Sequence, residues 1–296
     1  SGPGYEQRAA TFAAEIAAEI RRHVGADARL AVERVELALS DALRATGLAL
    51  GDATPVLLDA RRLKLDLEVM AMGGAIDAVD AAVGEFAAAI TDGATEIGIW
   101  AELHRGLIAR EGEYVSTRLM QSGPHTFPYF QEAGPRVVRA GDLVCLDTDA
   151  IGPHGYAVDF SRTFLCGDGP ATSTQRGLHA LAYEQLQHNA ALLAPGRSFE
   201  SFARRAWTVP ARHAPFGYYC IAHGIGLSGE APNIPSAVSG RPYPLPGEFE
   251  LGMTVCVESY IGDPESAQGV KLEDQYLLTP TGAERLTTYP FDPALC

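Results

Sequence analysis

The chain has 296 residues, of which 47% are hydrophobic, so it can bury the core of one large domain with or without a smaller unit. Its formal net charge of −14, from 23 basic and 37 acidic side chains, argues against a nucleic-acid backbone or an anionic membrane surface as partner. No apolar run approaches the roughly 20 residues that span a bilayer. The five cysteines, an odd number without paired spacing, predict no disulfide framework and favour a reducing cytoplasm.

Short elements fill the first 60 residues. Apolar residues at helical spacing predict helices over residues 8–24 and 35–46. Extended patterns predict short strands over residues 29–33 and 54–58. These pieces are too short to bury much surface by themselves.

Longer elements follow. Residues 65–90 carry apolar side chains at three- and four-residue steps and predict a long helix. A second helix is predicted over residues 95–109, with Glu96 in its first turn, and a strand over residues 114–120.

The remaining chain alternates strand pairs with helices. Two helices are predicted over residues 172–193 and 199–213. Strands are predicted over residues 142–150, 156–166, 254–261 and 270–279. This order indicates two related halves, each a strand pair covered by helices.

Acidic residues occur within the otherwise apolar first strand pair. Asp147 and Asp149 are two residues apart on a predicted strand, so their side chains face the same way, and Asp159 lies on the partner segment. Burying such groups unpaired is costly, and close carboxylates repel each other. A bound divalent cation would remove both costs.

The second strand pair repeats this pattern. Glu258 and Glu273 each follow an apolar run, and His223 lies in a glycine-rich segment where the backbone can approach a site closely. A single acidic residue on a strand is usually a solvated edge or a turn cap, so the prediction depends on all six residues together. Oxygen-rich ligation with one histidine fits iron, manganese or cobalt better than a structural zinc site. Several bridging carboxylates imply two metals about 3.5 Å apart.

Several segments carry a family resemblance. Residues 141–147 and 155–164 resemble the first metal motif of the pita-bread superfamily, which contains methionine and Xaa-Pro aminopeptidases, prolidase and creatinase. Residues 223–227, 252–258 and 269–274 resemble its next three motifs, in the same order.

The resemblance, which covers about residues 60–290, implies an α+β pita-bread fold. That fold is a curved, mostly antiparallel sheet with pseudo-twofold halves, helices on its outer face and metals in its concave middle. The resemblance also implies two parts: residues 1–60 as the remnant or tail of an amino-terminal creatinase-like domain, and residues 61–296 as the catalytic domain.

Two departures from the peptidases concern histidines. The peptidases carry one shortly before the first metal strand, where Phe130 falls here and His125 is offset. They carry another directly before a glutamate, where Gly229 precedes Glu230. Because these histidines bind substrate and move protons in the peptidases, their absence argues against peptide hydrolysis.

One branch is more similar. Residues 146–149, 256–262 and 269–273 resemble the metallopeptidase-like dimethylsulfoniopropionate lyases, which bind two metals, usually iron, through an extra aspartate that matches Asp149. Those enzymes cleave a C–S bond by removing a proton alpha to a carboxylate. The resemblance implies six metal ligands: Asp147, Asp149, Asp159, His223, Glu258 and Glu273.

The resemblance also bears on catalysis. It places Tyr218 near the substrate, and it places the general base of the lyases at Gly229, which cannot take a proton. Glu230 or a Tyr218 tyrosinate is therefore expected to act as the base, or else the substrate and reaction differ.

Other residues have two interpretations each. Arg162 is expected to bind a substrate carboxylate or to form a structural ion pair, and Tyr219 to line the pocket or to pack under it. His125 is either a loop residue or a substrate contact. Cys145 and Cys256 are expected to be small buried fillers or to tune the site.

These observations predict a metal-dependent lyase acting on a small carboxylate. The alternatives are an Xaa-Pro peptidase or creatinase-like C–N hydrolase, and a non-enzymatic binding module. The expected cofactors are two divalent metal ions, iron first and manganese, cobalt or zinc as alternatives. A homodimer is expected from the family resemblance.

Overall fold

The computed structural model describes residues 2–129, 131–236 and 246–296, and the chain separates into two compact units, Ser1–Ala60 and Arg61–Cys296. Among the described helices, none combines the length and the apolar character needed to cross a bilayer.

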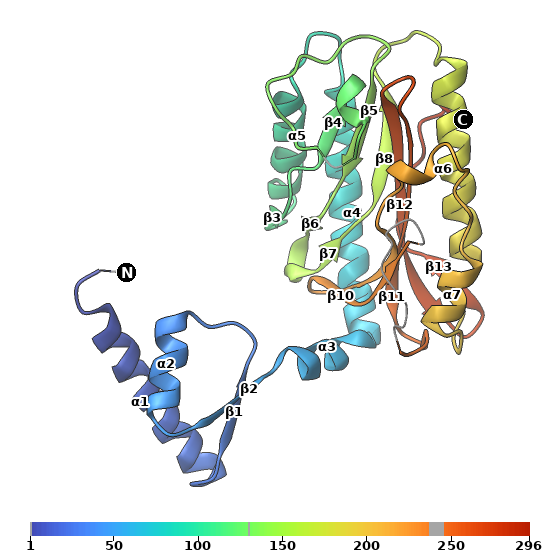
Figure 1. Cartoon of the computed structure of the whole chain (residues 1–296). Coiled ribbons are helices and arrows are strands. Elements are labelled where there is room, and N and C mark those ends of the chain that lie inside the picture. Colours follow the sequence, from blue (N-terminus) through green and yellow to red (C-terminus); the bar gives the residue numbers. More distant parts are fainter. Residues whose placement is uncertain (1, 130, 237–245) are drawn as a thin grey trace. The chain divides into compact units, whose positions relative to one another are not determined.

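The first unit is a small α/β element. Its strands β1 and β2 pair in parallel, and Ala17, Ala28 and Leu48 form its small core (Figure 1). Phe12 is 53% exposed, because helix α1 buries its alanines instead. The elements are α1 (Tyr5–Val24), β1 (Arg29–Val32), α2 (Leu37–Ala45) and β2 (Ala49–Asp52).

The strand predicted over residues 54–58 is wrong. These residues belong to helix α3 (Thr54–Arg62). The Asp52 carboxylate accepts a hydrogen bond from the backbone N–H of Thr54, and Pro55 follows at a position where its missing N–H costs nothing. This start signal outweighs the short apolar pattern that suggested a strand.

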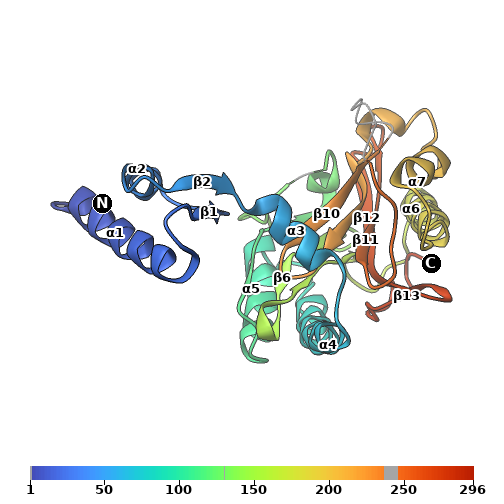
Figure 2. The ribbon, with the colours of Figure 1, turned by 90° about the horizontal axis from the view of Figure 1, so that it is seen from below.

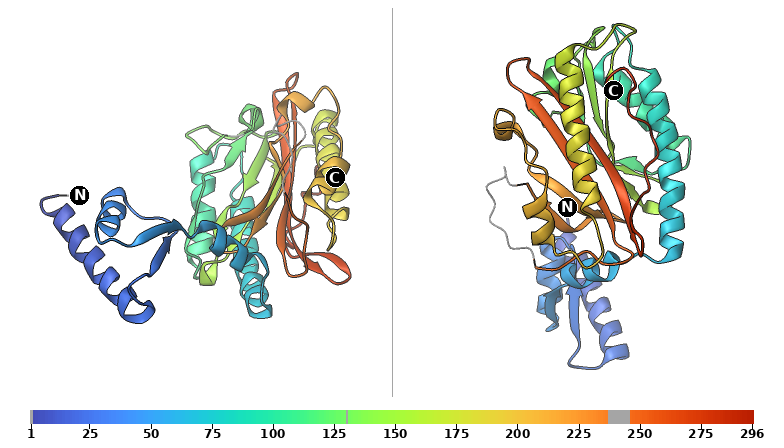
Figure 3. Two further views of the ribbon diagram at one scale, coloured as in Figure 1. Left: turned by 60° about the horizontal axis from the view of Figure 1, so that its bottom comes forward. Right: turned by 90° about the vertical axis from the view of Figure 1, so that its right-hand side faces the viewer.

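Four helices cover the sheets of the second unit on two sides. Figure 2 shows strands β11 and β12 between the pair α4–α5 and the pair α6–α7. In the right-hand view of Figure 3 the yellow helix α6 lies over the orange-red strands β11 and β12. The helices are α4 (Asp66–Ala88), α5 (Glu96–Ile108), α6 (Ser173–Ala191) and α7 (Phe199–Arg205).

The strands of this unit pair antiparallel in three sheets. The orders are β4-β5-β8, β3-β6-β7 and β10-β9-β11-β12-β13. Thr163 of β8 donates through Oγ1 to the carbonyl of Lys271 in β12 at 2.9 Å, so the first and last of these sheets adjoin. The strands are β3 (Tyr114–Val115), β4 (Met120–Ser122), β5 (Leu143–Asp147), β6 (Ala150–Ile151), β7 (Ala157–Val158), β8 (Ser161–Leu165), β9 (Cys220–Ile225), β10 (Gly229–Pro235), β11 (Thr254–Asp263), β12 (Gln268–Thr279) and β13 (Gly282–Arg285). The α+β class with mostly antiparallel strands and outer helices is as predicted.

Several predicted elements are shorter or split, among them the strand over residues 156–166, which is divided into β7 and β8. The strand over residues 142–150 ends at Asp147, because Asp149 has a φ of 38°, in the left-handed region, and turns the chain before β6. The strand over residues 114–120 is divided into β3 and β4. The helix over residues 199–213 ends at Arg205, shortly before Pro210, which disfavours helix on its amino-terminal side.

Both faces of strands β11 and β12 are almost completely buried from solvent. All ten residues of β11 are buried, and so are most residues of β12, because helices cover one face and β8 approaches the other. Polar residues on these strands must therefore satisfy one another inside the protein. This requirement defines the site.

Candidate metal centre

Acidic side chains from three parts of the second unit converge on His223. Glu258 of β11 and Glu273 of β12 are directly opposite each other in the ladder, and Asp159 lies between β7 and β8. The His223 Nε2 atom is 3.4 Å from Asp159 Oδ2, 3.3 Å from Glu258 Oε1 and 3.5 Å from Glu273 Oε1. Three of the other five predicted ligands are therefore within contact distance of the His223 imidazole.

Asp147 joins this group through Ser161. The Ser161 Oγ atom is 2.8 Å from Asp147 Oδ1 and 3.0 Å from Glu273 Oε2. Ser161 begins β8, whose register places it opposite Asp147 on β5. The hydroxyl thus links the carboxylates of the two halves.

Asp149 lies in the turn that follows β5. Its Oδ2 atom accepts a hydrogen bond of 2.6 Å from Thr117 Oγ1, and its positive φ directs the chain away from the strand. Burial, followed by the negative charge of Asp147, raises the pKa of the Asp149 carboxyl to about 7.

The residues present fit a metal. Asp159 Oδ1 and Glu273 Oε1 are buried and accept no hydrogen bond within the described part of the chain, and buried acceptors without partners are rare. Burial and then the Glu273 charge raise the pKa of Asp159 well above its usual value. A divalent cation would supply the missing partner and remove the repulsion. Ligand atoms of Asp159, His223, Cys256 and Glu273 all lie within 4.8 Å of one another.

Cys256 adds a thiol to this group. It is opposite His223 in the β9–β11 ladder and fully buried, and burial raises its pKa well above the usual value. Its Sγ atom donates to the Asp159 carbonyl at 3.5 Å. Cys145, in contrast, contacts Thr163 Oγ1 and the Gly269 carbonyl, away from His223.

Sequence reasoning missed Lys271, whose ammonium group is fully buried among the carboxylates. Its Nζ atom is 2.7 Å from Glu273 Oε2 and 3.4 Å from Asp147 Oδ2, and it also donates to Glu258. A signal was present: Lys271 stands between two apolar residues and two positions before Glu273, so both side chains share one face of β12.

Tyr129 was also missed. Its hydroxyl donates a hydrogen bond of 2.6 Å to Asp147 Oδ2. Nothing in the local sequence points to this contact, because Tyr129 lies in a loop 18 residues before its partner.

Arg162 makes its contacts inside the protein. Its five N–H groups all donate inside the protein: to Asp274 Oδ1, twice to the Tyr289 carbonyl, and to the carbonyls of Ser161 and Glu273. The side chain is fully buried. Of the two interpretations the structural ion pair holds, and Arg162 anchors the backbone of a ligand strand.

Glu230, one of the two residues expected as the base, is held in an ion pair. Its Oε2 atom pairs with Lys64 Nζ at 2.8 Å, and its Oε1 accepts the backbone N–H of Leu227 at 3.2 Å. Both charged side chains are nearly inaccessible, at 2% and 1% exposure for lysine and glutamate. The pair fixes the turn after His223 and leaves Glu230 fully engaged.

The predicted tyrosines lie at the site. Burial, followed by the charge of Glu258, raises the pKa of Tyr218 above its usual value. Tyr219 is adjacent, with ring centroids 4.6 Å apart, and is 45% exposed.

His125 lies next to Glu96 and not next to the carboxylate cluster. Its Nδ1 atom is 3.4 Å from Glu96 Oε1, a buried carboxylate that also accepts from Ser122. The His125 side chain is half-exposed. No described contact brings it to the carboxylate cluster, so the loop interpretation agrees better with its position.

Comparisons with known proteins identify the family to which this chain belongs. Residues 71–280 match the model of metallopeptidase family M24. The chain is 38% identical over 305 residues to dimethylsulfoniopropionate lyase DddP of Roseovarius nubinhibens, an alignment that covers 99% of this chain and 67% of that protein. It is 30% identical over 252 residues to the probable dipeptidase PepE of Mycobacterium tuberculosis, covering 81% and 62%.

Solved structures share the fold. An Xaa-Pro dipeptidase from Bacillus anthracis superposes with a TM-score of 0.80 at 22% identity, covering 95% of this chain and 77% of that one. The prolidase from Pyrococcus furiosus gives 0.75 at 22% identity, covering 88% and 76%. The predicted pita-bread fold is therefore confirmed. The chain belongs to metallopeptidase family M24, a family of metal-dependent enzymes.

Proposed function

We propose that this chain is a dinuclear metal-dependent lyase that cleaves the C–S bond of a small sulfonium carboxylate, dimethylsulfoniopropionate or a close analogue. The observation that carries the proposal is Asp149, an additional carboxylate two residues after Asp147 that has a left-handed backbone and accepts a hydrogen bond from Thr117. The 38% identity to a named lyase over 99% of the chain supports it.

The proposed ligands balance two divalent ions. They are Asp147, Asp149, Asp159, His223, Glu258 and Glu273. Their five carboxylates and the Lys271 ammonium leave four negative charges when His223 is neutral, which two divalent cations neutralise. Oxygen donors with one imidazole suit iron first, then manganese or cobalt. Bound there, the ions would supply Lewis-acid polarisation of a substrate carboxylate.

The proposed reaction is an elimination. Solvent water or hydroxide takes a proton from the carbon next to the carboxylate, the electron pair of that C–H bond forms a C=C bond, and sulfur departs as a neutral sulfide with the C–S electron pair. The protein's own contribution includes orientation: Tyr129 fixes Asp147 through its hydroxyl, and Ser161 bridges Asp147 to Glu273.

Gly229 distinguishes this chain from the lyases it resembles. A Cβ atom built on Gly229 meets nothing within 4 Å, so a side chain is sterically tolerated where the lyases are expected to carry their base. Glu230, the next residue, is held by Lys64. Restoring an acid at position 229 is therefore expected to raise the elimination rate.

The rival function is hydrolysis of Xaa-Pro peptides. It is favoured by the shared fold and by the 30% identity to a probable dipeptidase. It is disfavoured because Gly229 stands where the peptidases are expected to carry a proton-shuttling histidine.

Two assays on one metal-loaded preparation separate the two reactions. We expect dimethyl sulfide in the headspace above dimethylsulfoniopropionate and no cleavage of an Xaa-Pro dipeptide panel. The Gly229→Asp variant should release sulfide faster, by roughly the 10²–10⁴-fold typical of a positioned base. Gly169→Asp, another glycine with open surroundings, is the matched control and should change nothing. Dipeptide cleavage without sulfide release would refute the lyase proposal.

The remaining assignments are proposals as well. We propose that residues 1–60 correspond to the tail of a creatinase-like amino-terminal domain, which agrees with their forming a compact unit. A homodimer and a cytoplasmic location are proposed on the family resemblance and on the free thiols of the five cysteines.

A further inference from the structure

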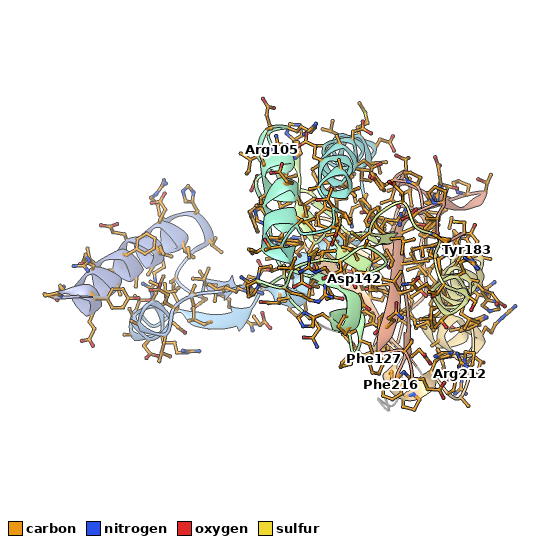
Figure 4. The ribbon with its side chains drawn as sticks, turned by 90° about the horizontal axis from the view of Figure 1, so that it is seen from above. Arg105, Phe127, Asp142, Tyr183, Arg212 and Phe216 are labelled. Carbon is orange, nitrogen blue, oxygen red and sulfur yellow. The ribbon has the colours of Figure 1, made fainter. Side chains whose placement is uncertain are left out.

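Two loops bring aromatic side chains together beside the metal centre. Tyr129 follows the 3₁₀ turn Gly123–Thr126, and Tyr218 and Tyr219 follow the 3₁₀ turn Ala214–Phe216. The same two segments also meet through Phe127 and Phe216, whose ring centroids are 5.0 Å apart and which Figure 4 labels side by side. The contact between the loops is therefore built twice, once with phenylalanines and once with tyrosines.

The tyrosine rings are inclined to one another rather than stacked. Tyr129 and Tyr218 have centroids 5.2 Å apart and an interplanar angle of 79°, and Tyr218 and Tyr219 have 4.6 Å and 55°. Rings at these distances touch one another, so the three tyrosines form one continuous aromatic surface, and the faces of such rings attract cations.

These rings already contact a cation. The Lys271 ammonium lies 5.8 Å from the Tyr129 centroid and 5.2 Å from the Tyr218 centroid, within the range of cation–π attraction. The same ammonium contacts Asp147 and Glu273, so the rings adjoin the carboxylates. Because Tyr219 is 45% exposed, the group extends from the metal centre toward solvent.

We propose that Tyr129, Tyr218 and Tyr219, here called the tyrosine cluster, bind the positively charged onium group of the substrate. The substrate class is then a small zwitterion with a carboxylate at the metals and a sulfonium or quaternary ammonium group at the rings. This inference rests on the proposed function only in assigning the carboxylate to the metals.

The chemistry of the elimination predicts where this interaction acts. Sulfur is positively charged in the substrate and neutral in the departing sulfide, so cation–π attraction weakens along the reaction. Such an interaction stabilises bound substrate more than the transition state. Losing it should therefore raise KM and kcat together and change kcat/KM much less than either, and the neutral sulfide should leave the rings readily.

Two probes of equal shape test the proposal without any cleavage. The first is 3-(trimethylammonio)propionate, and the second is 4,4-dimethylpentanoate, in which carbon replaces the charged nitrogen. Calorimetry on the metal-loaded full chain should show the cation binding about 2–30-fold more tightly, the ratio that cation–π energies of roughly 0.5–2 kcal/mol give.

Variants at Tyr219 separate the rings from the surrounding carboxylates. Tyr219 is the choice because Tyr129 also bonds Asp147. Tyr219→Leu should lower the ratio of the two affinities toward one, and Tyr219→Phe should preserve it. An unchanged ratio in Tyr219→Leu would assign the preference to the carboxylates and overturn the proposal, as would equal binding of both probes, or no binding of either, by the unaltered chain.

The two proposals fail in different ways. A chain that prefers the ammonium probe through its rings but releases no dimethyl sulfide would retain the tyrosine cluster and lose the lyase reaction. A chain that releases the sulfide without preferring the cation would lose only the tyrosine cluster.

Discussion

Replacing Asp149 by alanine is expected to reduce sulfide release by on the order of 10³-fold or more, because the Lewis-acid contribution of a metal amounts to several kcal/mol. Asp149 is not part of the strand that carries Asp147: its left-handed φ of 38° follows the end of that strand, and its carboxylate accepts a hydrogen bond from Thr117. Losing it should also lower the metal content from two ions per chain to one. Both quantities are measured on the same preparation, by headspace assay and by elemental analysis.

A graded control accompanies this variant. Thr117→Ala removes only the hydroxyl that donates to Asp149 Oδ2, and it should cost about 10–100-fold, as outer partners of metal ligands do. Full activity and two metals in Asp149→Ala would show that Asp149 is not a ligand.

The second large effect is expected at Lys271. Its ammonium is fully buried against Asp147, Glu258 and Glu273, so Lys271→Met would leave these carboxylates without their lysine counter-charge. Removing one partner of a buried ion pair typically costs about 3–5 kcal/mol of unfolding free energy. We expect that loss in the metal-free protein and a much smaller loss when divalent ions are bound, because the ions then neutralise most of the charge.

Denaturant unfolding of Lys271→Met with and without a chelator measures this difference. Lys271→Arg keeps the positive charge and is the matched control, with a loss that reflects the change of shape only. An equal loss for Lys271→Met in both conditions would mean that the side chain acts through packing and not through charge.

Local patterns predicted the elements that are set by local chemistry. The long helices α4, α5 and α6 follow from apolar spacing, and the strand pairs β5–β8 and β11–β12 follow from apolar runs. The failures occur where a single residue decides the local structure. Asp52 starts a helix at Thr54 against a weak strand pattern, and Asp149 ends a strand that the hydrophobic pattern continues.

The residues of the candidate site also fall into two groups: those that the local sequence predicts and those that depend on distant contacts. The carboxylates and His223 were predicted because acidic residues within apolar strands are costly without a cation. Their partners depend on contacts between distant parts of the chain. Lys64 pairs with Glu230 across 166 residues, and Lys271 reaches Ser161 across 110 residues. No spacing rule reveals such contacts, so the sequence could not show that Glu230 is held by Lys64 or choose between the two interpretations of Arg162.

The central claim is that these buried acidic groups exist to hold divalent cations. Elemental analysis of the full chain, purified without chelator and assayed for sulfide release, tests it most directly. The account predicts about two divalent ions per chain, iron foremost, with activity lost on their removal and regained on their return. A preparation that remains folded and fully active with no detectable metal would contradict it.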